Sequence, residues 1–291
     1  MTKLGFNLLA HPKLIKQGKY DLSALEKQLF KVAEVCDTYH TKGHKTSDLW
    51  FRIRGGNGSQ RFGLEIFSDK ILDTWSKLQQ TYGFKVIYGV NFNDVMDYMV
   101  YEKIATKIKI YAIEMGNEQY LPKFRKTAVE DKTGVVTKRT EKMSVEKYLQ
   151  LMQGYLVEYH KTVLPIFVQI APEGKNDGEY YKNWNKTILK FIKTNTVFNL
   201  NACMHCYDST FPYELISKIK VNIGNKSLFV TEYGAEKNNG KHAQKIRERL
   251  GENDAMFSHE LFNDYEGGEA VAWFNEQGLT DKGKELIKTL F

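Results

Sequence analysis

Short apolar runs alternate with longer amphipathic stretches along the chain. Runs rich in β-branched and aromatic residues predict strands, and apolar residues at helical spacing predict helices. The expected strands are Lys3–Leu9, Leu49–Arg54, Lys85–Asn91, Ile108–Met115, Ile166–Ala171, Leu200–Cys206, Ser227–Thr231 and Ala270–Phe274. The expected helices are Leu22–Tyr39, Ile66–Thr81, Asn93–Ala105, Ser144–Val163, Glu179–Lys193, Phe211–Ile219, Ala243–Tyr265 and Asp281–Leu290. Eight strands, each followed by a helix, predict an α/β fold, a (β/α)8 TIM barrel forming a single domain over residues 1–291.

Local signals between these elements agree with a barrel. Ser144 starts a helix together with Glu146, and Thr280 followed by Asp281 supplies a cap for the last helix. Residues 120–143 have no apolar period and predict a polar excursion of the loop after the fourth strand. A doubly wound open sheet is the alternative, but neither G-x-G-x-x-G nor G-x-x-x-x-G-K-[ST] follows an expected strand.

The composition supports a large folded core. Of the 291 residues, 42% are hydrophobic, which excludes a disordered or collagen-like chain. The longest apolar runs are too short to span a membrane, and the N-terminal apolar stretch is interrupted by Asn7 and lacks a cleavage site typical of a Sec signal. We therefore expect no membrane partner, and a protein that is cytoplasmic, released by lysis or associated with a virion.

Charge and cysteine content change this picture little. A net charge of +7 raises an acidic glycan or a nucleic acid as a partner, but the basic residues are spread along the chain. We expect a solvated basic surface and no nucleic-acid partner. Cys36, Cys203 and Cys206 cannot all pair, and a strand places the last two on opposite faces, so we expect free buried thiols and no zinc site.

Amides, carboxylates, arginines and aromatic rings gather at the expected strand ends. In a barrel, the loops that carry function begin there. Glu118 follows the fourth strand and Glu232 ends the seventh, and these strands lie across the barrel from each other. A retaining glycosidase needs two carboxyl groups about 5–5.5 Å apart, one as nucleophile and the other as acid and then base. The pair Glu118 and Glu232 is therefore the candidate catalytic pair.

Five of these strand-end elements resemble, in order, those of clan GH-A glycoside hydrolases, with the heparanase-like and arabinofuranosidase-like branches the most similar. They are Arg52-Ile53-Arg54-Gly55-Gly56 on strand two, Gly116-Asn117-Glu118 on strand four, His205-Cys206-Tyr207 on strand six, Thr231-Glu232-Tyr233-Gly234 on strand seven and Trp273 on strand eight. Arg54 departs from the Pro that often stands in the strand-two pattern. A changed loop or an added anion contact would follow from that departure.

The resemblance implies a role for each of these residues, and it requires no cofactor or metal. Glu232 would attack the anomeric carbon and Glu118 would act as acid and then base. Asn117 would bind the sugar 2-hydroxyl, while Tyr207 and Arg52 would hydrogen-bond Glu232. Further candidates for substrate binding are Asn91, His205 and Trp273.

Three of these residues have a plain structural alternative. Arg52 is also suited to tie strand two to the barrel interior, because barrel interiors need paired charges. His205 is equally suited to be a structural histidine. A strand tryptophan such as Trp273 commonly packs in a core.

Two functions remain open at this point. The first is a retaining O-glycoside hydrolase acting on an oligo- or polysaccharide, an acidic one among the candidates. The second is a carbohydrate-binding or virion-associated structural protein that keeps the barrel without turnover. The intact Glu118 and Glu232 pair favours the enzyme.

Overall fold

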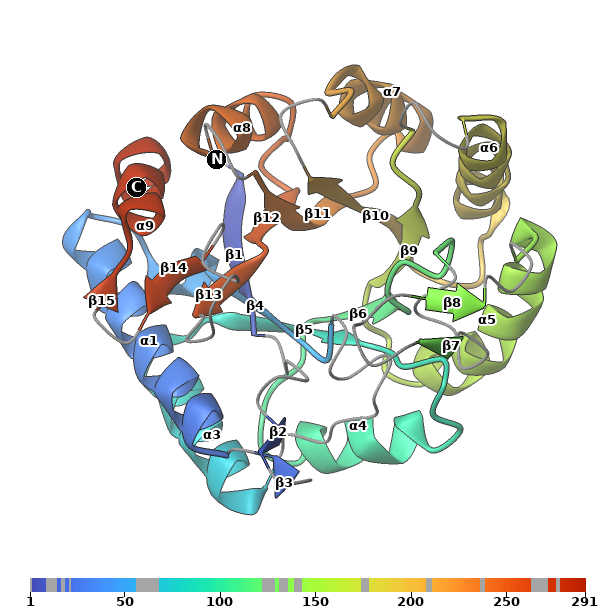
Figure 1. Cartoon of the computed structure of the whole chain (residues 1–291). Coiled ribbons are helices and arrows are strands. Elements are labelled where there is room, and N and C mark those ends of the chain that lie inside the picture. The colour runs from blue at the N-terminus through green and yellow to red at the C-terminus, as the bar shows by residue number, and fades with distance from the viewer. Residues whose placement is uncertain are drawn as a thin grey trace.

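The computed structural model describes residues 2–8, 15–16, 19–20, 22–55, 68–121, 129–130, 136–138, 143–173, 178–207, 211–235, 239–262, 272–275 and 278–291. Within them, eight parallel strands close a barrel in the order β1-β12-β11-β10-β9-β6-β5-β4, seen end-on in Figure 1. Their bounds are β1 Lys3–Asn7, β4 Trp50–Ile53, β5 Lys85–Gly89, β6 Ala112–Met115, β9 Ile166–Ile170, β10 Leu200–Tyr207, β11 Leu228–Gly234 and β12 Ala255–Ser258. The predicted (β/α)8 barrel is confirmed.

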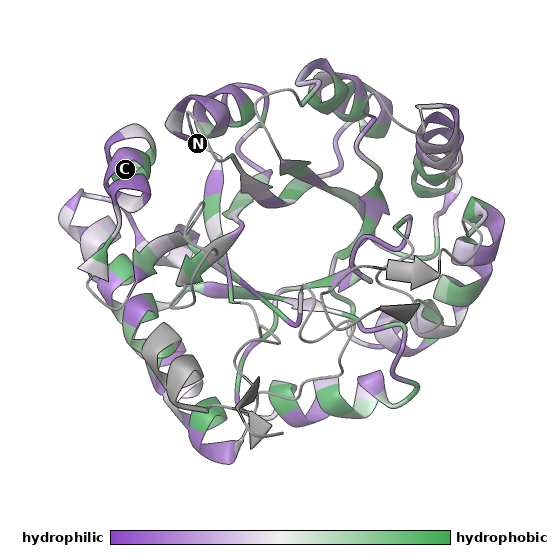
Figure 2. Cartoon of the chain, viewed as in Figure 1, coloured by the Kyte–Doolittle hydropathy of each residue, from purple (hydrophilic) through white to green (hydrophobic). Residues whose placement is uncertain are grey.

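A ring of α-helices surrounds the barrel (Figure 1). Their bounds are α1 Leu22–Thr41, α3 Asp69–Tyr82, α4 Asp97–Ala105, α5 Val145–His160, α6 Gly178–Thr194, α7 Glu214–Ile223, α8 Asn239–Arg247 and α9 Asp281–Leu290, with a 3-10 turn η2 at Thr46–Asp48. Figure 2 shows hydrophobic and hydrophilic residues interleaved along these helices, as expected for helices with one buried face. No helix among the described residues has the length and apolar character to cross a membrane.

The predicted helix starts at Ser144 and Thr280 are confirmed. The Ser144 Oγ accepts a hydrogen bond from the Lys147 N–H at 3.2 Å, and the Thr280 Oγ1 accepts one from the Gly283 N–H at 2.9 Å. Each cap satisfies a backbone donor that the helix itself leaves unpaired. The polar excursion expected at 120–143 lies largely outside the described residues, which include a short antiparallel pair there, β7 Val129–Glu130 and β8 Val136–Lys138.

The prediction for the eighth strand, Ala270–Phe274, is wrong. The barrel closes through β12, which pairs in parallel with β1 and β11 and lies inside the expected helix Ala243–Tyr265. The helix there, α8, ends at Arg247. All four residues of β12 are buried, so its sequence lacks the alternation of polar and apolar residues that marks a half-exposed strand. A run this short also cannot be distinguished from part of a helix by its pattern.

The segment expected as strand eight forms a small sheet outside the barrel. In it, β14 Ala272–Asn275 pairs in parallel with β13 Glu260–Phe262 and antiparallel with β15 Gly278–Leu279. A further short antiparallel pair joins β2 Ile15–Lys16 to β3 Lys19–Tyr20.

The barrel interior has an apolar layer and a polar layer. Side chains that point inward on alternate strand positions form one cluster: Trp50, Ile87, Ala112, Phe167, Cys203, Phe229, Ala255 and Phe257. Two residues further along the strands, the inward positions are polar, as in Arg52, Glu114, Gln169 and His205. The period of two along each strand therefore places a charged layer directly on top of an aromatic floor. The cysteines Cys36, Cys203 and Cys206 are free and buried, as predicted.

Candidate active site

Arg52 is the hub of the polar layer and is fully buried. Its Nε donates a hydrogen bond to the Glu114 carboxylate. Its Nη1 donates to Glu232 Oε1 at 2.6 Å and to Asn7 Oδ1 at 2.8 Å, and its Nη2 donates to Asn117 Oδ1 at 2.7 Å. One planar guanidinium thus fixes side chains from β1, β6, β11 and the β6–α5 loop, a task suited to its rigid fork of donors.

Glu114 is a second buried carboxylate that sequence reasoning missed. It shares Arg52 with Glu232, and its Oε1 accepts a hydrogen bond from the Thr231 hydroxyl at 2.8 Å. The Gln169 amide lies 3.4 Å from the same oxygen and the Cys203 thiol 3.5 Å from it. The alternation of side chains along the strand could have identified Glu114, because it occupies an inward position of β6 two residues before Gly116.

A β-bulge on β11 brings two successive side chains into the barrel. Met204 pairs with Val230 and His205 pairs with Glu232, so Thr231 is the extra residue on β11. As a result Thr231 bonds Glu114 while Glu232, the next residue, bonds Arg52. Regular alternation would turn one of them away, so the bulge lets both face the polar layer.

The surroundings of Glu232 favour its carboxylate form. Burial raises the pKa of this carboxyl group, but the positive charges of His205 and Arg52 outweigh that effect. With His259 and a hydrogen bond from the Tyr207 hydroxyl, they lower the pKa of Glu232 to about 2. Glu232 is therefore ionised at any pH near neutrality.

The carboxylates of Glu118 and Glu232 both lie close to the imidazole of His205. The His205 Nδ1 lies 3.1 Å from Glu118 Oε1 and 3.5 Å from Glu232 Oε2. Because both distances share one atom, the two carboxylate oxygens lie within about 7 Å of each other, near the range of catalytic carboxyl pairs. The carboxylates expected to face each other are thus brought together in one cluster.

The backbone at Glu118 is strained. Its φ is 45°, in the left-handed region that non-glycine residues avoid, and it follows Gly116 with φ 81°. Such a residue costs roughly 1–3 kcal/mol and persists where its surroundings hold it. The tight turn at the end of β6 carries Glu118, which is 8% exposed, to the barrel mouth.

His205 is held between three carboxylates. Burial lowers the pKa of its imidazole, but Glu232 and Glu118 more than offset this and raise it. Its Nε2 lies 4.0 Å from Glu114 Oε1. The raised pKa favours the protonated, positively charged form of His205 among these carboxylates.

Asn117 has one satisfied and one unsatisfied end. Its Oδ1 accepts from Arg52, which fixes the orientation of the amide, while its buried Nδ2 has no hydrogen-bond partner among the described residues. A buried donor without a partner is costly in a folded protein unless a ligand or water completes it. The Asn117 amide is therefore oriented to donate a hydrogen bond to a bound molecule.

Tyr207 and His259 form the rim next to Glu232. The Tyr207 hydroxyl donates to Glu232 and lies 3.1 Å from the His259 Nδ1. Burial is the largest effect on each, raising the pKa of Tyr207 and lowering that of His259. His259 was missed because it directly follows β12, whose residues were expected to be helical.

Trp273 was predicted on the eighth barrel strand, but it lies on β14, outside the barrel. It is 1% exposed, its indole N–H donates to the Ser258 hydroxyl at 2.8 Å, and its ring packs edge-on against Phe6 at a centroid distance of 4.8 Å. These contacts are those of a core residue that braces the ends of β1 and β12.

Asn91 and Arg54 belong to a neighbouring polar cluster. The Asn91 Oδ1 accepts from the Asn93 N–H at 3.0 Å, and the Asn91 N–H donates to Asp97. Arg54, with a left-handed φ of 63°, donates to Asp97 Oδ1 at 2.9 Å and is 2% exposed. Burial raises the pKa of Asp97 to about 6. The loop expected to change lies outside the described residues after Gly55, and the Arg54 guanidinium bonds a buried carboxylate.

Among the residues that the structure describes, no group of three or more His, Cys, Asp and Glu side chains is arranged to hold a metal ion.

Sequence comparison places the chain in no known group, since no family model and no curated protein matches it. Solved structures that share its fold include glycoside hydrolases of clan GH-A. A GH10 endoxylanase from a sugarcane soil metagenome is 9% identical with a TM-score of 0.56, covering 99% of this chain and 97% of that one. The β-mannanase of Thermomonospora fusca, in complex with mannotriose, is 12% identical with a TM-score of 0.55, covering 99% and 89%. A β-glucosidase from Exiguobacterium marinum is 10% identical with a TM-score of 0.54, covering 99% and 98%. At these identities the likeness shows a shared barrel fold.

Proposed function

We propose that the protein is a retaining O-glycoside hydrolase acting on an oligo- or polysaccharide. The observation that carries the proposal is the convergence of Glu118 and Glu232 on one nitrogen of His205. The resulting upper limit of about 7 Å on the separation of the carboxylate oxygens admits the spacing of about 5–5.5 Å at which a carboxylate attacks directly. The endoxylanase, the β-mannanase and the β-glucosidase that share the fold are consistent with this class of reaction.

The two carboxyl groups differ in the charge that surrounds them. Arg52 and His205 bring two positive charges to the cluster, and Glu114 and Glu232 balance them. A proton on Glu118 then leaves the buried cluster neutral, which is the cheaper state in a low-dielectric interior. This balance assigns the nucleophile role to Glu232 and the acid role to Glu118.

In the first step, a Glu232 oxygen attacks the anomeric carbon and the bond from that carbon to the leaving oxygen breaks. Glu118 gives its proton to the leaving oxygen, so no alkoxide is released. Asn117 donates to the sugar 2-hydroxyl through the Nδ2 that has no partner among the described residues. That contact strengthens as positive charge develops on the sugar ring.

In the second step, the Glu118 carboxylate takes a proton from a water whose oxygen attacks the same carbon. The bond between this carbon and Glu232 breaks, and the carboxylate returns to its bonds with Arg52 and Tyr207. Two inversions leave the configuration of the anomeric carbon unchanged.

The proposal is tested by assaying hydrolysis of a panel of aryl glycosides and oligosaccharides by the wild-type protein, Glu232→Gln and Glu118→Gln. We expect Glu232→Gln to lose activity by a factor of about 10³ or more on every cleaved substrate. Glu118→Gln should lose most on substrates with poor leaving groups, and least on an activated aryl glycoside that needs no proton.

Wild-type turnover that persists in Glu232→Gln would overturn the assignment. Binding of glycans by all three proteins without turnover by the wild type would instead identify a carbohydrate-binding protein on this barrel.

A further inference from the structure

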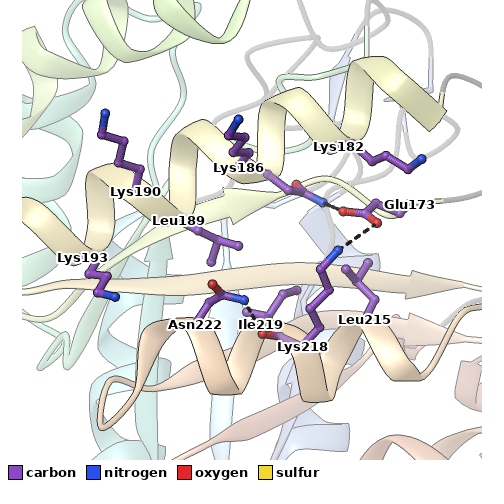
Figure 3. A pocket seen from close by; sticks show the side chains of 11 residues that line it. Glu173, Lys182, Lys186, Leu189, Lys190, Lys193, Leu215, Lys218, Ile219 and Asn222 are labelled. Atoms are coloured by element: carbon purple, nitrogen blue, oxygen red, sulfur yellow. Dashed lines mark hydrogen bonds and ion pairs between the residues drawn. The ribbon is translucent and has the colours of Figure 1, made fainter.

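A groove outside the barrel collects positive charge between helices α6 and α7. Its volume is about 470 Å³, and Figure 3 shows its lining residues on the two helices. Among the described residues that line it, Glu173 is the one acidic residue, and five are lysines: Lys182, Lys186, Lys190, Lys193 and Lys218. The groove starts beside Glu173, on the connection from β9 to α6, and the C-terminal strand ends of a barrel carry its active-site face.

The lysines of α6 form one stripe. They are spaced by four, four and three residues, so their Cα atoms lie on one face of the helix. From Lys182 to Lys193 this face is about 16 Å long. Figure 3 shows Lys186 and Lys190 on the side of α6 away from α7, Lys193 on the side toward α7, and Lys218 reaching across from α7 toward Glu173.

Two of the five groove lysines have a carboxylate partner: Lys182 pairs with Glu179 at 3.1 Å, and Lys218 lies 3.9 Å from Glu173. In the part of the chain that the structure describes, no carboxylate lies within ion-pair distance of Lys186, Lys190 or Lys193. Like charges four residues apart on a helix repel each other, so a bound anion would relieve their repulsion.

The floor of the groove is apolar and aliphatic. Leu189, Leu215 and Ile219 lie between the lysines, which gives a surface for the C–H faces of sugar rings. Proteins that bind single-stranded nucleic acid combine a basic groove with aromatic side chains on which the bases stack. The described lining contains no aromatic residue and no arginine, so it fits a charged polysaccharide better than a nucleic acid.

We propose that the α6–α7 groove is a binding site for an anionic polysaccharide, one that bears carboxylate or sulfate groups along its chain. The choice of a carbohydrate among polyanions rests on the proposed function. A chain held there lies beside the barrel mouth, because α6 begins where the β9 strand end leads out of the barrel. The groove would thus retain a polymer while the central site acts on it.

The test compares two triple variants that lose the same charge. Lys186→Gln/Lys190→Gln/Lys193→Gln removes the stripe, and Lys77→Gln/Lys147→Gln/Lys288→Gln removes three exposed lysines from α3, α5 and α9. Exposed substitutions of this kind change stability little. Dissociation constants are measured over a salt series for polygalacturonate, dextran sulfate, a neutral β-glucan and an oligo-dT strand.

We expect the wild-type protein and the control triple to bind polygalacturonate or dextran sulfate alike. The groove triple should bind the same polymer about tenfold more weakly, with a smaller salt dependence. The relative affinities of the two polymers distinguish carboxylate from sulfate as the preferred group.

Three results would overturn the proposal: no binding of either polyanion, equal weakening by both triples, or tighter groove-dependent binding of the oligo-dT strand. Failure of the proposed function looks different. It would leave groove-dependent polyanion binding intact while the wild-type protein hydrolyses no glycoside.

Discussion

A single buried arginine holds the charges of the central site in place. Arg52 bonds Glu114 and Glu232 and orients the amide of Asn117. Burying such ions is costly, and removing one partner leaves the others without compensation. The carboxylate and the amide proposed to act on the sugar are therefore positioned by a residue that need not touch the substrate.

Replacement of Arg52 by Lys should impair activity and stability together. A lysine keeps one charge but cannot bond four side chains, so the pKa of Glu232 should rise toward its ordinary value. We expect the acid limb of the pH–rate profile to move to higher pH, kcat/KM to fall about 10²-fold, and unfolding free energy to fall by about 3 kcal/mol. Arg249→Lys, at a surface pair with the exposed Glu214, is the matched control. An unshifted acid limb in Arg52→Lys would contradict the role assigned to Arg52.

The Asn117 Nδ2, which has no partner among the described residues, leads to a separate prediction about the substrate. Asn117→Ala should lower kcat/KM about 10²-fold on a cleaved glycoside, since a buried hydrogen-bond donor is lost in the transition state. The same variant should be nearly as active as the wild-type protein on the 2-deoxy analogue, because the partner hydroxyl is absent. The comparison of the four rate constants isolates this one contact. Additive losses would show that Asn117 does not bind the 2-hydroxyl.

At the residue scale, the sequence could predict the site residues at strand ends better than those inside the strands. Glu118, Glu232, Asn117 and Arg52 stand beside Gly or other strand-end signals, and the structure brings all four into one cluster. Glu114 lies within an apolar strand, where a lone carboxylate carries no local signal of its partner. Long-range pairing, here with Arg52 across 62 residues, decided its place.

At the scale of elements, the end of β4 is shaped around Arg52. A Cβ added to Gly55 would lie 2.1 Å from the Arg52 Nη1, closer than any atom can approach. The absence of a side chain at Gly55 therefore leaves room for the guanidinium of Arg52.

Gly55→Ala should therefore destabilise the protein by about 1–3 kcal/mol and reduce activity, because the guanidinium must move. Gly154→Ala is the matched control: it lies within α5 with no atom near the added Cβ and should stabilise the protein by about 0.5–1 kcal/mol. Urea unfolding of both variants gives the comparison. Equal stability of Gly55→Ala and the wild-type protein would rule out the packing described for Arg52.

The elements also show where pattern reading fails. Seven of the expected barrel strands overlap the observed ones, since each has an apolar run of sufficient length beside a clear helix. The eighth, β12, has four buried residues and continues almost directly into β13, so its signal merges with that of the preceding helix. Its identity depends on pairing with β1, a contact between residues some 250 positions apart, and the error concealed His259 and misplaced Trp273.

For the whole molecule, the buried ions couple stability to pH. The pKa of Glu232 in the folded protein is about 2, below its ordinary value of 4.5. Its contribution to stability is therefore present above pH 4.5 and is lost as the pH falls toward 2. The raised pKa of His205 acts in the opposite direction, since its contribution is present at low pH and is lost as the pH rises through the folded pKa.

We accordingly expect the free energy of unfolding to fall by about 3 kcal/mol from Glu232 alone between pH 5 and pH 2. Urea titrations at several pH values in this window provide the measurement. Glu232→Gln should be less stable at pH 6 and should show a flatter dependence on pH over the same window. A slope identical to that of the wild-type protein would show that Glu232 is not the depressed group.

At the scale of the molecule, the central site and the groove carry charge in different ways. Arg52 pairs with Glu114 and Glu232 inside the barrel, whereas the α6–α7 groove gathers five lysines on the outside. The two proposals therefore concern different regions, an enclosed site for the reaction and an outer groove for a charged polymer.

The stereochemistry of hydrolysis tests the central claim most directly. The anomeric protons of the first product released from a cleaved glycoside of known configuration can be followed by NMR before the sugar mutarotates. Double displacement through Glu232 predicts that the product first appears with the anomeric configuration of the substrate. A product that first appears with the opposite configuration would contradict the account, because a single displacement by water needs no nucleophilic Glu232.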